Sequence, residues 1–175
     1  MKENLQLLYS VAEIAKKVKI LAAEIQNELP RCEDFVCVCV LKGAFLFFSD
    51  LVRHFDSRAI CAFTRVSSYG DETKSSGTVR MPMQCTEDVT DKHVLIVDDI
   101  ADSGLSLSFL TKYFADKGAA SVRTAVLIDR PNSRTNGFTP NFAAFTLTDR
   151  RFVVGYGLDD KQRYRNLPGI YVVDN

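Results

Sequence analysis

The sequence has few of the residues that build structural metal sites or disulfide frameworks. Its 175 residues include two histidines and five cysteines, and no two cysteines form a C-x-x-C pair. An odd number of cysteines at these spacings argues against structural zinc and, more strongly, against a disulfide framework. Cys37 and Cys39 occupy alternate positions in the apolar stretch FVCVCVL, so we expect them to be buried thiols in a protein core.

The chain also lacks an excess of charge and any long apolar run. Twenty-two basic and 22 acidic residues cancel, which removes any broad electrostatic attraction to nucleic acid or to an acidic membrane. No apolar run approaches the roughly 18 residues that span a bilayer, and the N-terminus has no signal-peptide core. We therefore expect a cytoplasmic protein with no nucleic-acid or membrane partner, in which any anion site is local.

What is present is the composition of an ordinary globular domain. Apolar residues make up 46% of the chain and charged residues 25%, and this length encloses one substantial core but is short for two. We therefore expect residues 1–175 to form a single domain. Residues 9–29 place apolar side chains at helical intervals, and Ser10 and Glu13 have capping-box spacing, which together predict an amphipathic helix.

The middle of the chain alternates between strand and helix patterns. Continuous apolar, β-branched runs predict strands buried on both faces, and helical patterns follow two of them. The predicted strands are 35–43, 58–66, 77–85, 92–100 and 121–129, and the predicted helices are 44–55 and a segment from about residue 105 to Gly118. Short strands and loops complete the chain. This order predicts an α/β fold with a mainly parallel, twisted sheet flanked by helices.

The stretch DDIADSGLS (98–106) combines acidic side chains with a turn suited to an anion. Asp98 and Asp99 end a predicted strand, and ligands of such sheets bind beyond the carboxyl ends of the strands. The two carboxylates suit hydroxyls or a hard cation such as Mg²⁺. The turn offers backbone amides, two serine hydroxyls and Gly104 for close backbone approach. The two halves therefore suit the ribose hydroxyls and the 5′-phosphate of one sugar phosphate.

Two other interpretations of this stretch remain open on the residues alone. In the first, Asp98 and Asp99 merely end a strand while Ser103 caps the following helix. In the second, VLIVDD opens a phospho-acceptor receiver domain with an acidic metal-binding pair. Receiver domains begin at such a strand and need more chain than residues 94–175 provide, and the Ser/Gly turn that follows does not fit them.

VLIVDDIADSGLS resembles the phosphoribosyl-pyrophosphate signature of the type I phosphoribosyltransferases. Three further stretches, LKGAFLFFSDL, SSYG and FVVGYGLDDKQRYRNLP, are similar in the same order to the pyrophosphate loop, lid and purine segment of the hypoxanthine(-guanine) enzymes. The resemblance implies the type I phosphoribosyltransferase fold, with a small hood formed by terminal segments. It also implies Mg²⁺-dependent transfer of the phosphoribosyl group from phosphoribosyl pyrophosphate to a 6-oxopurine, giving IMP or GMP and pyrophosphate.

The resemblance assigns a role to each matching residue. Asp102 becomes the general base near the purine N7, and proton transfer by a positioned side chain is worth about 10²–10⁴-fold. The residues that it assigns to binding of the phosphoribosyl group are Asp98, Asp99, Asp102, Ser103, Gly104, Leu105 and Ser106. Those assigned to pyrophosphate binding are Lys42, Gly43 and Arg165, and those assigned to the lid are Ser68 and Tyr69. The residues assigned to purine binding are Arg130, Phe152, Val153 and Asp159, and those assigned to metal binding are Asp98, Asp99 and Asp159.

Without the resemblance, blander interpretations of the same residues stand. Lys42 would be a solvated lysine at a strand end, Phe152 and Val153 a buried strand, and SSYGDETKSS an idle connection. A phosphoribosyltransferase-fold regulator that binds RNA or DNA without turnover is the rival function, although the neutral charge and single domain do not suit it. Orotate and adenine enzymes share the Asp-rich turn but lack the purine segment found here.

Three positions depart from the family pattern. Ala44 replaces the second glycine after the loop lysine, which is tolerable where the backbone φ is negative, and Asp98 replaces the more usual glutamate. LIDRP places Arg130 where a lysine normally donates to the purine 6-oxo group, and the guanidinium fork is bulkier and aimed differently. The resemblance also implies a homo-oligomer, a dimer or tetramer, and a cis peptide at Leu41–Lys42 if the ligand site uses it.

Overall fold

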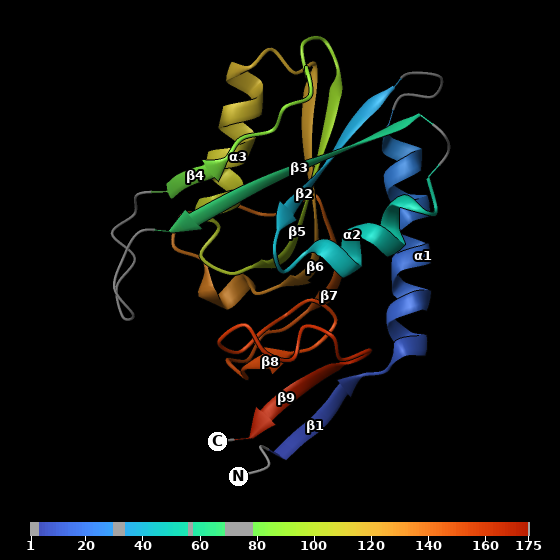
Figure 1. Cartoon of the computed structure of the whole chain (residues 1–175), viewed down its shortest axis with the longest axis vertical. Coiled ribbons are helices and arrows are strands. Elements are labelled where there is room, and N and C mark those ends of the chain that lie inside the picture. Colours follow the sequence, from blue (N-terminus) through green and yellow to red (C-terminus); the bar gives the residue numbers. More distant parts are fainter. Residues whose placement is uncertain (1–3, 30–33, 56–57, 69–78, 175) are drawn as a thin grey trace.

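A six-stranded sheet forms the body of the molecule (Figure 1). The computed structural model describes residues 4–29, 34–55, 58–68 and 79–174. The strand order is β4-β3-β2-β5-β6-β7, and every neighbouring pair is parallel except β3 with β4. The strands are β2 (Phe35–Leu41), β3 (Ala59–Ser68), β4 (Val79–Met83), β5 (His93–Ala101), β6 (Ser121–Asp129) and β7 (Phe142–Thr146). The predicted α/β class and mainly parallel sheet are confirmed.

Helices cover both faces of this sheet, which explains the continuous apolar runs of its central strands. The helices are α1 (Val11–Glu28), α2 (Phe45–Val52) and α3 (Leu105–Asp116). Cys37 and Cys39 point to the face that α1 and α2 cover, and both thiols are buried as predicted. Val36 and Val38 point to the opposite face, which α3 covers. Alternate residues of one strand therefore enter two different cores.

The first helix begins as its sequence predicts. The Ser10 backbone N–H donates to Glu13 Oε2 at 2.8 Å and the Glu13 N–H donates to Ser10 Oγ at 3.3 Å, so the capping box is complete. The second helix is shorter than the predicted segment 44–55, because it ends at Val52. No helix within the described ranges is both long and apolar enough to cross a bilayer.

A separate three-stranded sheet lies beyond the carboxyl ends of the main strands (Figure 1). Its order is β1-β9-β8, all antiparallel, with β1 (Asn4–Tyr9), β8 (Val153–Val154) and β9 (Ile170–Asp174). The N-terminal strand was not predicted, but the expected hood formed by terminal segments is confirmed. A short 3-10 helix, Pro131–Ser133, follows β6 on the way to β7. The segment between β8 and β9 faces the ends of β2 and β5, which places the hood over the site described next.

Candidate active site

A cavity of about 490 Å³ opens where β2, β3 and β5 end. Its walls come from the β2–α2 loop, the β5–α3 loop and the segment that joins β8 to β9, so three distant stretches of sequence meet there. The predicted site residues that line it are Lys42, Gly43, Asp98, Asp99, Asp102, Ser103, Gly104, Ser106, Asp159 and Arg165. Most of the phosphoribosyl and pyrophosphate set therefore shares one space.

Asp98 and Asp99 form an acidic pair near the end of β5. Asp98 is 7% exposed and Asp99 is half-buried. The Asp99 N–H donates to Asp98 Oδ1 at 2.9 Å, and the Ile100 N–H donates to Asp99 Oδ1 at 2.8 Å. Burial, reinforced by the charge of Asp99, raises the pKa of Asp98 well above its ordinary value, and burial raises the pKa of Asp99. A cation or hydroxyl donors at this pair would offset that desolvation.

The loop after β5 has the geometry of an anion-binding turn. Gly104 occupies the N-cap position of α3 with φ +82°, and this cap makes no side-chain hydrogen bond. The positive φ favours glycine, and a Cβ atom at Gly104 would also lie 2.5 Å from Asn136 Oδ1 and would displace that side chain. Ser103 is therefore not the N-cap, although its Oγ accepts from the Leu105 N–H at 3.4 Å. An uncapped helix start leaves amides available to a phosphate.

The loop after β2 contacts the acidic pair directly. The Leu41–Lys42 peptide is cis. A Cβ atom at Gly43 would fall 1.5 Å from Asp99 Oδ2, so the Gly43 backbone lies against that carboxylate. Lys42 is exposed, and its Nζ donates to Gln162 Oε1 at 3.3 Å. The lysine of this loop therefore extends across the cavity toward the C-terminal segment.

Arg165 connects the C-terminal segment to the same cavity. Its Nη2 pairs with Asp159 Oδ1 at 2.7 Å, and its Nη1 donates to the Gly157 carbonyl at 2.7 Å. Its Nε is buried and has no hydrogen-bond partner within the described part of the chain. The second oxygen of Asp159 accepts from the Gln162 N–H at 2.7 Å. Across residues 4–29, 34–55, 58–68 and 79–174, no cluster of three or more His, Cys, Asp or Glu side chains could hold a metal.

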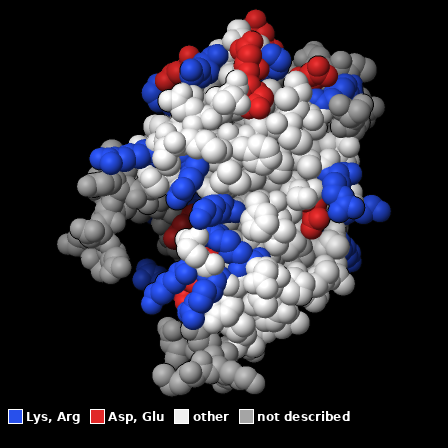
Figure 2. All heavy atoms as spheres, in the orientation of Figure 1, with Lys and Arg blue, Asp and Glu red and all other residues white. Residues whose placement is uncertain are grey.

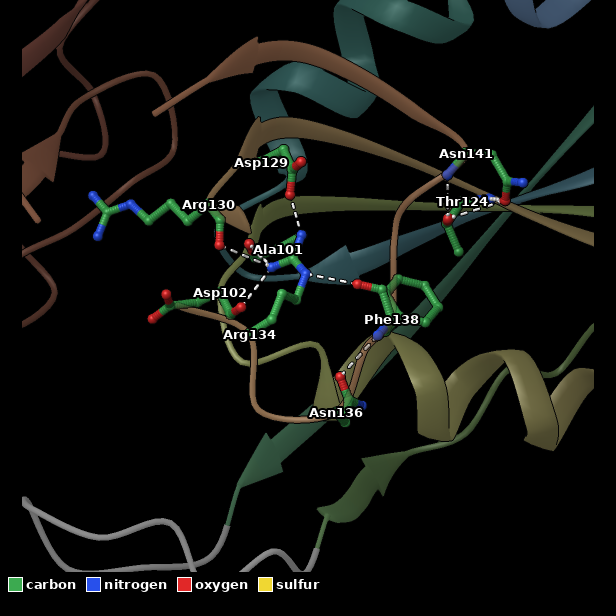
Figure 3. A network of polar contacts seen from close by, with 9 residues as sticks. All are labelled: Ala101, Asp102, Thr124, Asp129, Arg130, Arg134, Asn136, Phe138 and Asn141. Carbon is green, nitrogen blue, oxygen red and sulfur yellow. Dashed lines mark hydrogen bonds and ion pairs between the residues drawn. The ribbon is translucent and has the colours of Figure 1, made fainter. Parts of the chain in front are cut away.

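Three of the four predicted purine-binding residues, Arg130, Phe152 and Val153, lie outside the cavity lining, whereas Asp159 is part of it. Val153 is 4% exposed and begins β8, whereas Phe152 is 48% exposed, so the two do not form one buried strand. Arg130 Nη2 donates to the Arg151 carbonyl at 2.6 Å. Figure 3 shows the Arg130 and Asp102 side chains extending to the same side of the sheet ends. The exposed Phe152 ring and this pair of polar side chains are compatible with a planar ligand.

The remaining predicted site residues are Leu105, Ser68 and Tyr69. Leu105 begins α3 and does not line the cavity. Ser68 ends β3, and Tyr69 lies outside the described residues, so the predicted lid is not tested. Two residues near the site were not predicted, Gln162 and Arg134. Gln162 lies inside the stretch FVVGYGLDDKQRYRNLP but was given no role there, and Arg134 belongs to no motif. The only sequence signal for Arg134 is a basic residue in the short loop after a strand that neighbours the Asp-rich turn.

Charge gathers locally although the chain as a whole is neutral. On the face that Figure 2 shows, Lys and Arg side chains collect between the main sheet and the hood, around a few acidic ones. The same chain carries 22 basic and 22 acidic residues, so this concentration is not a general excess of positive charge. A local basic field of this kind attracts a small polyanion to the region of the cavity.

The sheet, the strand-end cavity and the loops around it define the class of the protein. Residues 7–161 match the phosphoribosyl transferase domain family. The match begins in β1 and includes the main sheet, the acidic pair and the 102–106 loop, as well as the hood strand β8.

Individual relatives narrow the class. The chain is 42% identical to a hypoxanthine-guanine phosphoribosyltransferase of Bacillus subtilis, over 99% of this chain and 96% of that protein. It is 40% identical to one of Aquifex aeolicus, over 99% and 97%. A solved Bacillus anthracis hypoxanthine-guanine phosphoribosyltransferase superposes with a TM-score of 0.92 at 36% identity, covering 99% of this chain and 100% of that one. The chain therefore belongs to the hypoxanthine-guanine phosphoribosyltransferase family.

Proposed function

We propose that the protein is a purine salvage transferase, a pentosyltransferase. It joins a 6-oxopurine, hypoxanthine or guanine, to the phosphoribosyl group of phosphoribosyl pyrophosphate and releases pyrophosphate. The observation that carries this proposal is the single cavity that brings together an acidic pair, an uncapped helix start and two basic side chains. These groups suit the hydroxyls, the 5′-phosphate and the pyrophosphate of that one substrate. The family relationship supports the same assignment.

The sugar phosphate would lie across the ends of β2 and β5. The Asp98 and Asp99 carboxylates accept from the ribose hydroxyls. The amides and hydroxyls of the 102–106 loop hold the 5′-phosphate at the start of α3, where the helix dipole favours negative charge. Lys42 Nζ, the Gly43 backbone and the Arg165 guanidinium face the pyrophosphate. Their role is to stabilise the negative charge that grows on the leaving group as the glycosidic carbon becomes cationic.

The purine would lie between Asp102 and the hood. Asp102 accepts the proton that leaves the purine N7 as the new bond forms, which is general-base catalysis. Arg130 donates to the 6-oxo group, Phe152 stacks on the ring, and the Val153 backbone and Asp159 meet its edge. Ser68 and Tyr69 would close over the reacting atoms and exclude water, which protects the activated sugar from hydrolysis.

The acidic pair fits a divalent cation by its chemistry. Mg²⁺ is held in proteins through one or two carboxylates plus substrate oxygens. Asp98 is a buried carboxylate and Asp99 a half-buried one, and a cation would offset the desolvation of both. Asp159 already pairs with Arg165, so we assign it to a second Mg²⁺ through water. When bound, Mg²⁺ would supply positive charge to the departing pyrophosphate.

The proposal includes the state of the protein in the cell. Residues 1–175 would act as one phosphoribosyltransferase domain in the cytoplasm, as a dimer or tetramer. Phe45 follows the LKG loop at the start of α2 and is 39% exposed. Phe63 on β3 is 45% exposed, with its ring 5.6 Å from that of Phe48 on α2, and exposed aromatics here suit a contact between copies. Light scattering of the purified protein would give its mass, and a monomer at working concentration would contradict this part of the proposal.

The decisive experiment mixes the purified protein with phosphoribosyl pyrophosphate and Mg²⁺, and follows nucleotide formation with each of four bases. Turnover with hypoxanthine or guanine is the expected result. Turnover only with xanthine or adenine would retain the mechanism and reject the assignment of the purine pocket. Binding of phosphoribosyl pyrophosphate without turnover of any base would favour the regulatory alternative.

A further inference from the structure

Arg134 is a buried guanidinium that contacts five groups and lines no part of the cavity. It lies after the 3-10 helix, and its side chain is 11% exposed. It pairs with the Asp129 carboxylate, whose side chain is 15% exposed. Its remaining acceptors are backbone carbonyls, those of Ala101, Asp102, Arg130 and Phe138. Figure 3 shows it at the centre of this network, with the Asp102 and Arg130 side chains directed away from it.

Two of the four carbonyls that Arg134 binds lie at the start of the phosphate loop, residues 102–106. Ala101 ends β5 and Asp102 is the first loop residue, and one Nη1 group donates to both carbonyls. The next carbonyl, that of Ser103, accepts from the Thr135 N–H at 3.1 Å and from Thr135 Oγ1 at 3.2 Å. Arg134 and Thr135 therefore hold three successive carbonyls on one side of the loop.

The direction of these carbonyls fixes the direction of the loop amides. In a trans peptide the N–H points opposite to the C=O of the same plane, and the only cis peptide within the described ranges is Leu41–Lys42. The three held carbonyls therefore turn the N–H groups of Asp102, Ser103 and Gly104 to the opposite side. Asp102, Ser103 and Gly104 all line the cavity.

We propose that Arg134 is a positioning residue for the transfer reaction, which orients the phosphate loop from behind without touching substrate. Its guanidinium holds the carbonyls of Ala101 and Asp102, so that the loop amides are directed at the 5′-phosphate before it arrives. This inference rests on the proposed function. An arginine suits this position because its planar fork offers five N–H donors in fixed directions, whereas a lysine offers three donors from one point.

The test compares Arg134→Lys with Thr124→Val. Thr124 is 1% exposed, and its hydroxyl accepts from the Asn141 N–H at 3.1 Å and donates to Asn141 Oδ1 at 3.2 Å. It joins β6 to the start of β7 within the same region, away from the phosphate loop (Figure 3). Thr124→Val therefore removes a buried polar contact, as Arg134→Lys does, without releasing any loop carbonyl.

We expect Arg134→Lys to lower kcat/KM for phosphoribosyl pyrophosphate by about 10²-fold, the scale of a small misplacement of reacting groups. The KM for hypoxanthine should stay unchanged. Thr124→Val should lower the melting temperature while it keeps the kinetic constants of the unmodified enzyme. Equal kcat/KM for phosphoribosyl pyrophosphate in the two variants, at similar melting temperatures, would overturn the proposal.

A binding measurement separates this proposal from the proposed function. Calorimetric titration with IMP should show weaker binding to Arg134→Lys than to Thr124→Val, and equal affinities would contradict the positioning role. If the unmodified protein binds IMP but forms no nucleotide, the proposed function fails while the comparison of variants still stands. If Arg134→Lys does not fold, IMP binding to Asp129→Asn tests the positioning role instead. This variant keeps Arg134 and removes its counter-charge. Unaltered IMP affinity in Asp129→Asn would then overturn the proposal.

Discussion

Gly43 lies against the carboxylate of Asp99, so close that a Cβ atom on the glycine would fall 1.5 Å from Oδ2. On its other side, the carbonyl of Gly43 would lie 2.1 Å from a Cβ atom on Gly157. The β2–α2 loop, the end of β5 and the C-terminal segment therefore meet with no space for a methyl group. Contact at this point fixes the β2–α2 loop relative to the acidic pair.

A methyl group at this junction should disable the enzyme. We expect Gly43→Ala to lower kcat/KM for phosphoribosyl pyrophosphate by about 10²-fold, because the loop must move away from Asp99. The strain should lower the free energy of unfolding by about 1–3 kcal/mol. Steady-state kinetics and thermal unfolding measure the two effects.

The neighbouring residue gives a matched control. Ala44 has φ −75° and ψ −8°, an ordinary right-handed conformation, so a methyl is accommodated there although the family usually has glycine. Ala44→Gly should keep its activity and lose about 0.5–1 kcal/mol of stability through chain entropy. A Gly43→Ala variant as active as Ala44→Gly would contradict the close approach.

Asp102 should affect the rate of the chemical step rather than binding. It is exposed at the start of the phosphate loop, on the side to which Arg130 also extends. We expect Asp102→Asn to lower kcat by about 10²–10⁴-fold, the usual contribution of a general base. Both KM values should change little. Asp116→Asn, which breaks a surface ion pair of 2.9 Å with Lys112 on α3, is the control and should leave kcat unchanged.

Arg130 should determine affinity for the purine. One nitrogen of its fork is committed to the Arg151 carbonyl, while its Nε is buried without a partner among the described residues. Arg130→Met removes every donor, and a hydrogen bond to a charged group contributes about 1.5–3 kcal/mol. The KM for hypoxanthine should therefore rise by roughly 10- to 150-fold.

Two comparisons test this assignment. The KM for phosphoribosyl pyrophosphate should be unchanged in Arg130→Met. Arg130→Lys restores the residue usual in the family and should retain turnover, because a lysine still donates to an oxo group. An unchanged KM for hypoxanthine in Arg130→Met would show that the oxo group is recognised elsewhere.

Local sequence patterns predicted the parts of the fold whose cause is local. The run of β2 is apolar at every position, and those of β5 and β6 are apolar at their centres (94–97 and 125–128), because helices cover both faces of the sheet. The helix α1 carries its own capping box. The strand β1 was missed because its partner is β9: Leu5 pairs with Val173 from the far end of the chain. No local pattern reports such a pairing.

The same distinction applies to the site. The Asp-rich turn was predicted because its acids, hydroxyls and glycine are contiguous. Arg134 was missed because four of its five acceptors are backbone carbonyls. Every residue has a backbone carbonyl, so the sequence does not show which of them a side chain will bind. Arg130 and Phe152 were predicted from the family resemblance alone, and nothing in their immediate sequence distinguishes them from an ordinary loop and strand.

The capping box of α1 should give a pH-dependent stability. Hydrogen bonds from the Ser10 side chain and backbone lower the pKa of Glu13 below its ordinary value. A carboxylate whose pKa is lower in the folded state stabilises the protein above its unfolded pKa, and this contribution is lost as pH falls through the folded pKa. The difference in melting temperature between the unmodified protein and Glu13→Gln should therefore be largest near neutral pH and shrink in acid. A difference in melting temperature that stays constant with pH would contradict this origin.

The acidic pair should lower stability in the absence of ligand. Asp98 is buried beside Asp99, and burial with like charge disfavours its ionised form. Asp98→Asn keeps an acceptor for the Asp99 N–H and removes the charge, so the ligand-free variant should gain about 0.5–2 kcal/mol, as active-site substitutions often do.

The same variant should lose activity, because a neutral amide grips neither a cation nor two hydroxyls as a carboxylate does. Thermal unfolding without ligand measures the stability of the free protein, and unfolding with phosphoribosyl pyrophosphate and Mg²⁺ measures the stabilisation that the ligands add. The unmodified protein should gain more from the ligand than Asp98→Asn does. Asp91→Asn, at an exposed position with φ 58° that asparagine tolerates, should behave as the unmodified protein. A less stable ligand-free Asp98→Asn variant would mean that Asp98 contributes to folding, because the buried charge would then be compensated within the protein.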